Sequence, residues 1–300
     1  MGSGRVAAAV CALTLVSGCG TVFTPPPDYA HGVDRPVDVA AALGDLPTLD
    51  PCSLFDPSDF GATTTALYTF SDCDVSVGEV HVSVGSIDKL DVFPGQDAPV
   101  EFEGMTYLAY STQDMPCGRL LQFGSLALAV FPWFADTGTM TDACDRIAAG
   151  FEKMLKRLKY TPYRIKHRTF APTSLGGLDP CRTTPSAGLR VVKSWPTRHT
   201  CLWNDPDGQV SVQVSFGIHT TPPEETGSER IEVAGRPTVR YEIPIDDSLS
   251  CRLSGDHTVP GQREHESVNL TVYREDLQTS PCDEAKTYAA QLWPTLPPAK

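Results

Sequence analysis

The chain has 300 residues, of which 41% are hydrophobic and 20% are charged, and this composition excludes collagen-like, coiled-coil and wholly disordered proteins. Its 24 Lys and Arg residues are outnumbered by 37 Asp and Glu residues, so the formal net charge is -13. A surface this acidic repels phosphate backbones, and nucleic-acid binding is therefore not expected. The ten cysteines and 26 prolines indicate an oxidised, turn-rich protein, and the only apolar run, at the N-terminus, is too short to span a bilayer.

Residues 1–18 have the layout of an export signal. Arg5 precedes the small, apolar stretch Val6–Val16, which leads into Val16-Ser17-Gly18-Cys19. This tetrapeptide resembles the lipobox of bacterial lipoproteins. The resemblance implies cleavage after Gly18 and acylation of Cys19, so that acyl chains such as palmitate anchor the mature chain on the extracytoplasmic face of the cell membrane. The alternative is an ordinary secreted protein in which Cys19 is incidental.

Residues 19–46 are expected to form an anchored, proline-rich tether. Removal of residues 1–18 takes away Arg5 and no acid, so the net charge changes from -13 to -14. The segment shows no sustained periodicity, apart from a short helix expected over Val37–Leu43. At about 3.3 Å per residue, such a tether reaches at most on the order of 100 Å. That is enough to clear a layer of lipid headgroups.

The rest of the chain contains an internal repeat. The tetrapeptide Leu49-Asp50-Pro51-Cys52 recurs letter for letter as Leu178-Asp179-Pro180-Cys181, at an offset of 129 residues. Three further cysteines of the first half have partners at similar offsets, namely Cys73 with Cys201, Cys117 with Cys251, and Cys144 with Cys282. We therefore expect a first repeat over residues 47–160, a basic linker over 161–177 and a second repeat over 178–297.

The elements of the first repeat follow from its periodicity. Taken in chain order, they are a short helix around Pro57–Leu67, strands Asp72–Val77 and Val80–Val84, a strand Tyr107–Tyr110 that Gly104 enters, strands Cys117–Phe123 and Leu126–Phe131, and a helix capped by Asp142 and stopped by Pro162. The helix carries one apolar stripe, formed by Ile147, Phe151, Met154, Leu155 and Leu158.

The second repeat gives the same series of elements. They are a short helix around Pro185–Val192, strands Thr200–Trp203 and Val210–Phe216, a strand Thr238–Ile243 preceded by Gly235, strands Leu249–Leu253 and Ser267–Tyr273, and a final helix stopped by Pro294. Ser280, Pro281 and Asp283 predict a capped start for that helix, and Ala285, Tyr288, Ala289, Leu292 and Trp293 form its stripe. The fold class expected for each repeat is α+β, an antiparallel sheet with an N-terminal short helix and a C-terminal amphipathic helix.

The second repeat also carries a family resemblance. Its motifs are Leu178-Asp179-Pro180-Cys181, Cys201-Leu202-Trp203, Val233-Ala234-Gly235-Arg236, Cys251 and Pro281-Cys282-Asp283-Glu284-Ala285. Together they resemble the actinobacterial envelope lipoproteins built on the domain of unknown function 3558, and more distantly the extracellular sensor domain of the mycobacterial Ser/Thr kinase PknH. The resemblance implies a disulfide-bonded α+β module that binds or senses, with no established catalytic residue. The first repeat departs from the pattern, since Ser71-Asp72-Cys73-Asp74 replaces Cys-x-Trp there.

The eight cysteines of the two repeats indicate disulfide bonds rather than a metal site or a redox dithiol. They are spaced by 20 to 50 residues in an exported chain, with no Cys-x-x-Cys. Four cysteines per repeat allow three connectivities, and the spacing does not choose among them. Sequential pairing closes the shortest loops, joining Cys52 to Cys73, Cys117 to Cys144, Cys181 to Cys201 and Cys251 to Cys282.

The sequence offers no strong sign of catalysis, and neither a cofactor nor a metal is expected. No Gly-x-Ser-x-Gly elbow, HExxH helix, Walker loop or Rossmann glycine pattern occurs in the mature chain. His257 and His265 lie near Glu264 and Glu266 in a polar hairpin loop, where a solvated loop is favoured over a metal site.

One cluster interrupts the acidic sequence. Seven cations occupy sixteen positions without an acid, and they are Lys153, Lys156, Arg157, Lys159, Arg164, Lys166 and Arg168. One interpretation is a helix C-terminus followed by a solvated linker. The other is a contact with anionic lipid headgroups or wall polymers.

These observations favour a lipid-anchored, non-catalytic envelope lipoprotein that binds or senses an extracytoplasmic ligand. The expected partners are the membrane, through the lipid on Cys19, and an envelope ligand or protein that the sequence does not identify. The alternatives are a scaffold that docks another envelope protein and, as the least favoured, a hydrolase. A carrier predicts an apolar cleft between sheet and helix, whereas a scaffold predicts filled cores and an exposed apolar patch.

Overall fold

The structure is a computed structural model, and it describes residues 36–298 except positions 68, 78–79, 94, 113–116, 134–139, 184–187, 220–227, 246–247, 263 and 275–279. The expected signal peptide, Cys19 and most of the expected tether lie outside these residues. Within the described residues, no helix combines the length and the apolar character that a bilayer crossing requires.

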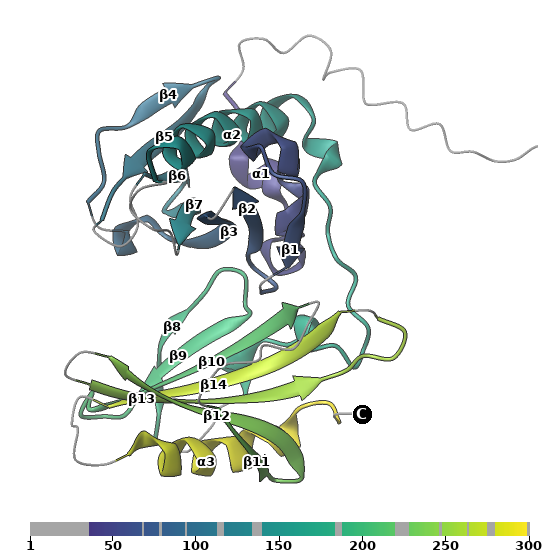
Figure 1. Cartoon of the computed structure of the whole chain (residues 1–300), viewed down its shortest axis with the longest axis vertical. Helices are drawn as coiled ribbons and strands as arrows, with labels where there is room; N and C mark the ends of the chain where they lie inside the picture. Colours follow the sequence, from purple (N-terminus) through teal and green to yellow (C-terminus); the bar gives the residue numbers. More distant parts are fainter. Residues whose placement is uncertain are drawn as a thin grey trace, which may run out of the picture. The chain divides into compact units, whose positions relative to one another are not determined.

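The fold is mostly β and consists of two antiparallel sheets of seven strands, each with a long helix (Figure 1). The strands of the first sheet are β1 Thr65–Leu67, β2 Cys73–Val77, β3 Val80–Lys89, β4 Val100–Phe102, β5 Met105–Tyr110, β6 Gly118–Phe123 and β7 Leu126–Trp133. Those of the second are β8 Arg190–Ser194, β9 Thr200–Asn204, β10 Val210–His219, β11 Glu229–Val233, β12 Arg236–Ile245, β13 Ser248–His257 and β14 His265–Arg274.

The two sheets have the same strand order. The first runs β1-β2-β3-β7-β6-β5-β4, and the second, read in the same direction, runs β8-β9-β10-β14-β13-β12-β11. Two meanders therefore meet at a central pair in each sheet, which is β3 with β7 in the first and β10 with β14 in the second. The two sheet modules are similar, as the repeated cysteine pattern predicts.

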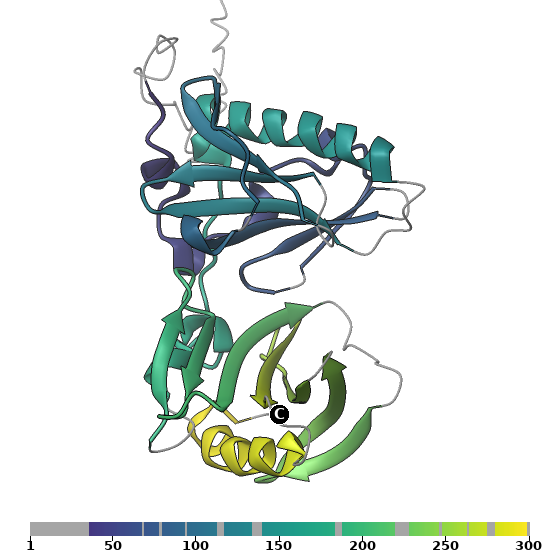
Figure 2. The same cartoon turned by 90° about the vertical axis from the view of Figure 1, so that its left-hand side faces the viewer.

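Each long helix covers a sheet, α2 with its whole predicted stripe and α3 with part of it, since Tyr288 is only partly buried and Trp293 lies in the turn after α3. Helix α2, Met140–Tyr160, runs along one face of the first sheet (Figure 2), and all five predicted stripe residues are at most 1% exposed. Helix α3, Pro281–Leu292, packs on β13 and β14 and buries Ala285, Ala289 and Leu292. Ser280 caps α3 through Cys282 N–H, as expected. Asp142 lies within the first turn of α2 rather than at its cap, because the helix already begins at Met140.

The helices expected after the two LDPC motifs are absent from the described residues, and this expectation was wrong. The first segment forms a single 3-10 turn, Pro57–Phe60, that ends at Gly61 in a left-handed conformation, and the threonines that follow lead into β1. The described end of the second segment enters β8 at Arg190, and Val191 and Val192 follow within that strand. Branching at Cβ disfavours a helix and suits a strand, and this local preference prevails in both segments.

Gly104 and Gly235 do not enter strands but form the turns of two hairpins. Phe102 pairs with Met105, and Val233 pairs with Arg236, so each turn has two residues. In each turn both residues have positive φ, namely Glu103 with Gly104 and Ala234 with Gly235. This conformation is the one that matches the twist of antiparallel strands, and glycine adopts it without steric cost.

The ends of the first module differ from the expected tether and linker. Helix α1, Val39–Leu43, falls within the segment assigned to the tether, and both of its terminal residues are buried in the core beneath α2. In the segment assigned to the linker, Leu175 is fully buried in the second core. Packing therefore begins before residue 47, where α1 contacts α2, and extends into residues 161–177, where Leu175 joins the core of the second sheet.

The structure contains four disulfide bonds, and they join sequential cysteines. The pairs are Cys52–Cys73, Cys117–Cys144, Cys181–Cys201 and Cys251–Cys282. The first and third fasten an LDPC turn to the second strand of its sheet. The second and fourth fasten a sheet to its long helix, so each module is closed at both ends.

Candidate anion-binding site

The LDPC motif builds a short, stapled turn in each module. Asp50 caps the 3-10 helix Pro51–Ser53, and its carboxylate accepts a hydrogen bond from Cys52 N–H at 3.3 Å. Asp179 does the same for Cys181 N–H at 2.9 Å. Proline fixes φ at the first helical position, and the cysteine then bonds to a strand. Three residues of the repeated motif therefore have structural roles: the aspartate caps the turn, the proline fixes its first residue, and the cysteine forms the disulfide bond.

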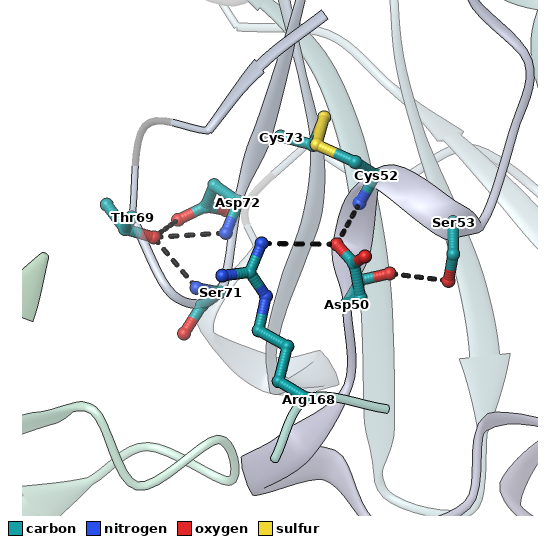
Figure 3. The surroundings of a disulfide bond; sticks show 8 residues. All are labelled: Asp50, Cys52, Ser53, Thr69, Ser71, Asp72, Cys73 and Arg168. Atoms are coloured by element: carbon teal, nitrogen blue, oxygen red, sulfur yellow. Dashed lines mark hydrogen bonds and ion pairs between the residues drawn. A yellow bond between two sulfur atoms is a disulfide. The ribbon is translucent and has the colours of Figure 1, made fainter. Parts of the chain in front are cut away.

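The first turn is bound to the basic segment that follows α2. Figure 3 shows Arg168 reaching toward Asp50, with its guanidinium 3.5 Å from the carboxylate. The backbones are also joined, since Asp50 N–H donates to Lys166 O at 2.9 Å and Lys166 N–H donates to Ser53 Oγ at 2.8 Å. These bonds hold residues 164–168 against the turn and so position their side chains.

Three of the seven predicted cations form ion pairs. Arg157 lies 3.0 Å from Asp59, Lys159 lies 2.9 Å from Glu103, and Arg168 binds Asp50. The Lys159 ammonium hydrogen-bonds the Glu103 carboxylate and lowers the pKa of that carboxyl. These three cations thus join α2 and the segment after it to acidic residues of the first module.

The other four cations, Lys153, Lys156, Arg164 and Lys166, are exposed and form no ion pair with a described residue. Lys153 lies 3.5 Å from the carbonyl oxygen of Asp59, and Lys156 lies 5.6 Å from the centre of the Phe102 ring. Arg164 and Lys166 have no such contact. The structure thus divides the cluster into a paired and an unpaired set.

Arg164 and Lys166 line a hollow of about 480 Å³ beside the first LDPC turn. Arg157 and Tyr163 line it as well, and the turn contributes Asp50 and Ser53. Because Arg157 and Asp50 already have oppositely charged partners, the two unpaired cations determine the charge of the hollow. Tyr163 is 52% exposed and adds a hydroxyl that can donate a hydrogen bond.

The hollow contains one cysteine and one serine, and both are already bonded. Its one cysteine, Cys52, is in a disulfide bond. Its one serine, Ser53, donates its hydroxyl proton to Asp50 O at 2.7 Å and accepts from Lys166 N–H. Neither is therefore available as a nucleophile. Guanidinium and ammonium groups beside a phenol are the donors that a phosphate or a carboxylate group requires.

His257 and His265 do not lie in a solvated loop, and that expectation was wrong. They end β13 and begin β14, and His257 and Glu266 are each only 1% exposed. Glu266 accepts hydrogen bonds from Ser174 Oγ at 2.5 Å and Leu175 N–H at 2.6 Å, and His257 Nε2 donates to Thr173 O at 2.6 Å. These polar groups serve to bind residues 173–175. In the described part of the chain, no three His, Cys, Asp or Glu side chains converge as metal ligands would.

The cations are visible in the sequence, but the groups that arrange them are not. Asp50, Ser53 and Tyr163 join Arg164 and Lys166 in the hollow only because residues 48–50 pair with residues 166–168. This pairing spans more than a hundred residues and leaves no local pattern. The repeated LDPC motif was the one sequence feature that pointed to this region of the molecule.

Comparison of the chain with family models, with curated proteins and with solved structures found no match.

Proposed function

We propose that the chain is an exported lipoprotein that binds an anionic group of the cell envelope in the hollow beside its first LDPC turn. In this proposal it is anchored through Cys19 on the extracytoplasmic face of the cell membrane, and it acts as a non-catalytic binding or sensing module. The observation that carries the proposal is the position of Arg164 and Lys166, which line the hollow without an ion pair to a described residue.

The anchoring is supported by the lipobox at Cys19, and the modular design by the structure. The shared strand order and the equivalent disulfide bonds support tandem copies of one module. We also propose that the second module is related to the envelope lipoproteins with the domain of unknown function 3558 and to the PknH sensor domain. That relation agrees with a binding role. Phosphate-bearing headgroups and wall polymers are the anions that a membrane-anchored protein meets at highest concentration.

A variant of the lipid-attachment residue tests the anchor. In a bacterial host, the full chain is expected to fractionate with membranes and to gain the mass of acyl chains at Cys19. The full-length Cys19→Ser variant is expected to lose both properties, because serine has no sulfur to acylate. A wild-type chain that leaves the membrane in high salt without detergent would contradict the anchor.

The binding site is tested on that unacylated Cys19→Ser chain with vesicles of phosphatidylglycerol or phosphatidylcholine. We expect binding to the anionic vesicles alone, and a loss of tenfold or more in Arg164→Gln/Lys166→Gln, since each cation contributes about 1 kcal/mol near an anionic surface. Soluble glycerol phosphate should compete if the phosphate group itself is bound. If it does not compete, the hollow recognises the charged lipid surface.

The control removes the same two charges elsewhere. Lys89 and Arg230 are exposed and form no ion pair with a described residue. Lys89→Gln/Arg230→Gln should therefore retain vesicle binding. Equal losses in the two double variants would mean that net charge, and not the hollow, governs binding, and the proposed function would then be abandoned.

A protein-docking scaffold is the second candidate. Both cores are filled, since the residues of α2 and α3 that face the sheets are at most 3% exposed. Such packing disfavours a carrier with an apolar cleft between sheet and helix. Val191 and Val192, at 50% and 53% exposure, form an apolar patch on the edge strand β8. A polypeptide that co-purifies with the chain and is displaced by Val192→Lys would favour this candidate. A hydrolase remains the least favoured alternative.

A further inference from the structure

A second hollow adjoins the second LDPC turn. It has a volume of about 310 Å³ and shares no lining residue with the first hollow. Leu178 and Asp179 of the turn line it, together with Phe170, Arg182 and Arg198. Each LDPC turn therefore borders a hollow with arginine side chains, although the arginines come from different segments in the two modules.

The floor of this hollow is apolar. Phe170 and Leu178 line it beside the backbone of Gly176. A Cβ atom on Gly176 would lie 2.4 Å from the Phe170 ring, so only glycine lets the ring pack here. His199 fixes the same backbone, because its Nε2 donates a hydrogen bond to Gly176 O at 3.1 Å. The floor is thus a preformed apolar surface.

The rim of this hollow is cationic. Arg198 is exposed in the turn between β8 and β9, at φ 58°, and makes no ion pair with a described residue. The Arg182 side chain is 79% exposed, and its Nε lies 3.7 Å from Asp179 Oδ2, beyond hydrogen-bond distance. Both guanidinium groups therefore retain donors for a ligand.

We propose that this second hollow binds a small organic anion in which a carboxylate is attached to a flat apolar body. Arg182 and Arg198 bind the carboxylate, and the body lies on Phe170 and Leu178. An inorganic anion leaves the apolar floor uncovered, and a neutral apolar molecule makes no charged contact with either guanidinium group. The two requirements together select the amphiphilic anion.

Three small probes separate the two requirements. Benzoate carries both charge and body, benzyl alcohol carries the body alone, and inorganic phosphate carries charge alone. Chemical shifts of the oxidised, full-length Cys19→Ser chain are followed while each probe is added. We expect saturable shifts with benzoate, and at least tenfold weaker binding of the other two.

Variants of the two rim arginines test whether benzoate binds in this hollow. Arg182→Gln/Arg198→Gln removes both charges, keeps polar side chains and alters exposed positions only, so the fold is expected to persist, and benzoate binding should weaken at least tenfold. Lys89→Gln/Arg230→Gln removes the same charge outside the hollow and should leave benzoate affinity unchanged. The lining of the first hollow is intact in both variants, so failure here is distinguishable from failure of the proposed function.

Three results would overturn the proposal. The first is the absence of benzoate binding, and the second is phosphate binding as tight as that of benzoate. The third is an equal loss of benzoate affinity in the rim variant and in the control, which would show that the carboxylate senses only overall charge.

Discussion

Glu266 and His257 face each other across β13 and β14, and both bind residues 173–175. Glu266 satisfies two donors, the Ser174 hydroxyl and Leu175 N–H, at a position from which water is excluded. Burial raises the pKa of Glu266, while the two hydrogen bonds oppose that shift. An acidic side chain is kept in this core because it replaces the water that those donors would otherwise bind.

Removal of that carboxylate should destabilise the second module. In Glu266→Ala, Leu175 N–H and the Ser174 hydroxyl lose their acceptor within the core, and we expect a loss of about 1–3 kcal/mol in the free energy of unfolding. Urea denaturation followed by tryptophan fluorescence measures it. Glu264→Ala removes the same charge in the neighbouring turn and should cost less than about 0.5 kcal/mol. Equal costs would contradict the buried role of Glu266.

His199 predicts a pH dependence of a definite sign. Burial lowers its pKa to about 4, so the folded chain keeps this imidazole neutral, whereas an unfolded histidine has a pKa near 6.5. Its contribution to stability is complete above pH 6.5 and is lost as the pH falls from 6.5 toward 4, since only the unfolded chain then takes up the proton.

The comparison with a variant that cannot titrate isolates this effect. Between pH 7 and pH 4.5 the free energy of unfolding of the wild type should fall by about 2–3 kcal/mol more than that of His199→Gln. Buried acids such as Asp72, whose pKa burial raises to about 6, shift stability in the opposite sense but equally in both proteins. Parallel pH profiles of the two proteins would show that His199 takes up its proton without unfolding.

At the scale of elements, β3 bends where the first LDPC turn approaches it. The register shifts between Val84 and Ser86, and Gly85 between them has φ 117°. A Cβ atom on Gly85 would lie 2.6 Å from Pro51 Cβ and 2.8 Å from Ser71 O. The bulge therefore lets the turn that carries Asp50 and Cys52 pack directly on the sheet.

Comparing Gly85→Ala with a control glycine should separate the cost of the steric overlap with the turn from the cost of a positive φ alone. We expect a loss of more than about 2 kcal/mol, because the new methyl group meets both a proline and a backbone oxygen. Gly124→Ala is the matched control, since Gly124 also has positive φ but a Cβ atom there would have no neighbour within 4 Å. It should cost about 1 kcal/mol. Thermal denaturation that ranks the two variants equally would contradict the packing argument.

The sequence predicted elements best where one side of a strand or helix is buried throughout. The stripe of α2 and the alternation of Val210, Val212 and Val214 in β10 report burial directly. The short helices expected after the two LDPC motifs were assigned wrongly. Those segments contain few apolar residues, and their residues branched at Cβ favour strands. The ends of β13 and β14 were taken for a loop because Glu266 and His257 are polar, and their partners lie about ninety residues away.

The candidate sites show the same limit. The cations were visible as a cluster, yet the sequence does not distinguish Arg164, which has no ion pair among the described residues, from Arg168, which binds an acid 118 residues earlier. Apart from the repeated LDPC motif, nothing in the sequence indicated the second hollow, because Phe170, Arg182 and Arg198 come from three separate segments. Ion pairs between residues far apart in the sequence determine which cations remain available to a ligand. The spacing of neighbouring residues does not predict those pairs.

At the scale of the whole molecule, four disulfide bonds close loops with sequence separations of 20 to 31 residues. In the chain-entropy treatment each contributes about 3 kcal/mol by restricting the unfolded chain. The total stability of a domain of this size is of the same order as two such bonds. Complete reduction is therefore expected to unfold the protein, as a loss of native tryptophan fluorescence in dithiothreitol would show.

Reduction should also proceed in order. Cys117 and Cys144 are both partly exposed, whereas each of the other bonds includes a cysteine at 0% exposure. Because exchange requires a thiolate to reach the sulfur, mild reduction of the folded chain should open Cys117–Cys144 first. Alkylation with mass spectrometry of peptides identifies the thiols released. Early labelling of Cys251 or Cys282 instead would indicate that the second module opens as a unit before the first.

The pairing of residues 48–50 with residues 166–168 has one more consequence. Arg168 N–H donates to Thr48 O at 2.7 Å, so the chain enters the first module and leaves it at neighbouring points. Residues 49–167 thus form one long loop with neighbouring ends, and α1, which packs in the same core, precedes it. Neighbouring chain ends are what insertion or exchange of a segment requires, so this loop can be lengthened, shortened or exchanged with only two short junctions to adjust.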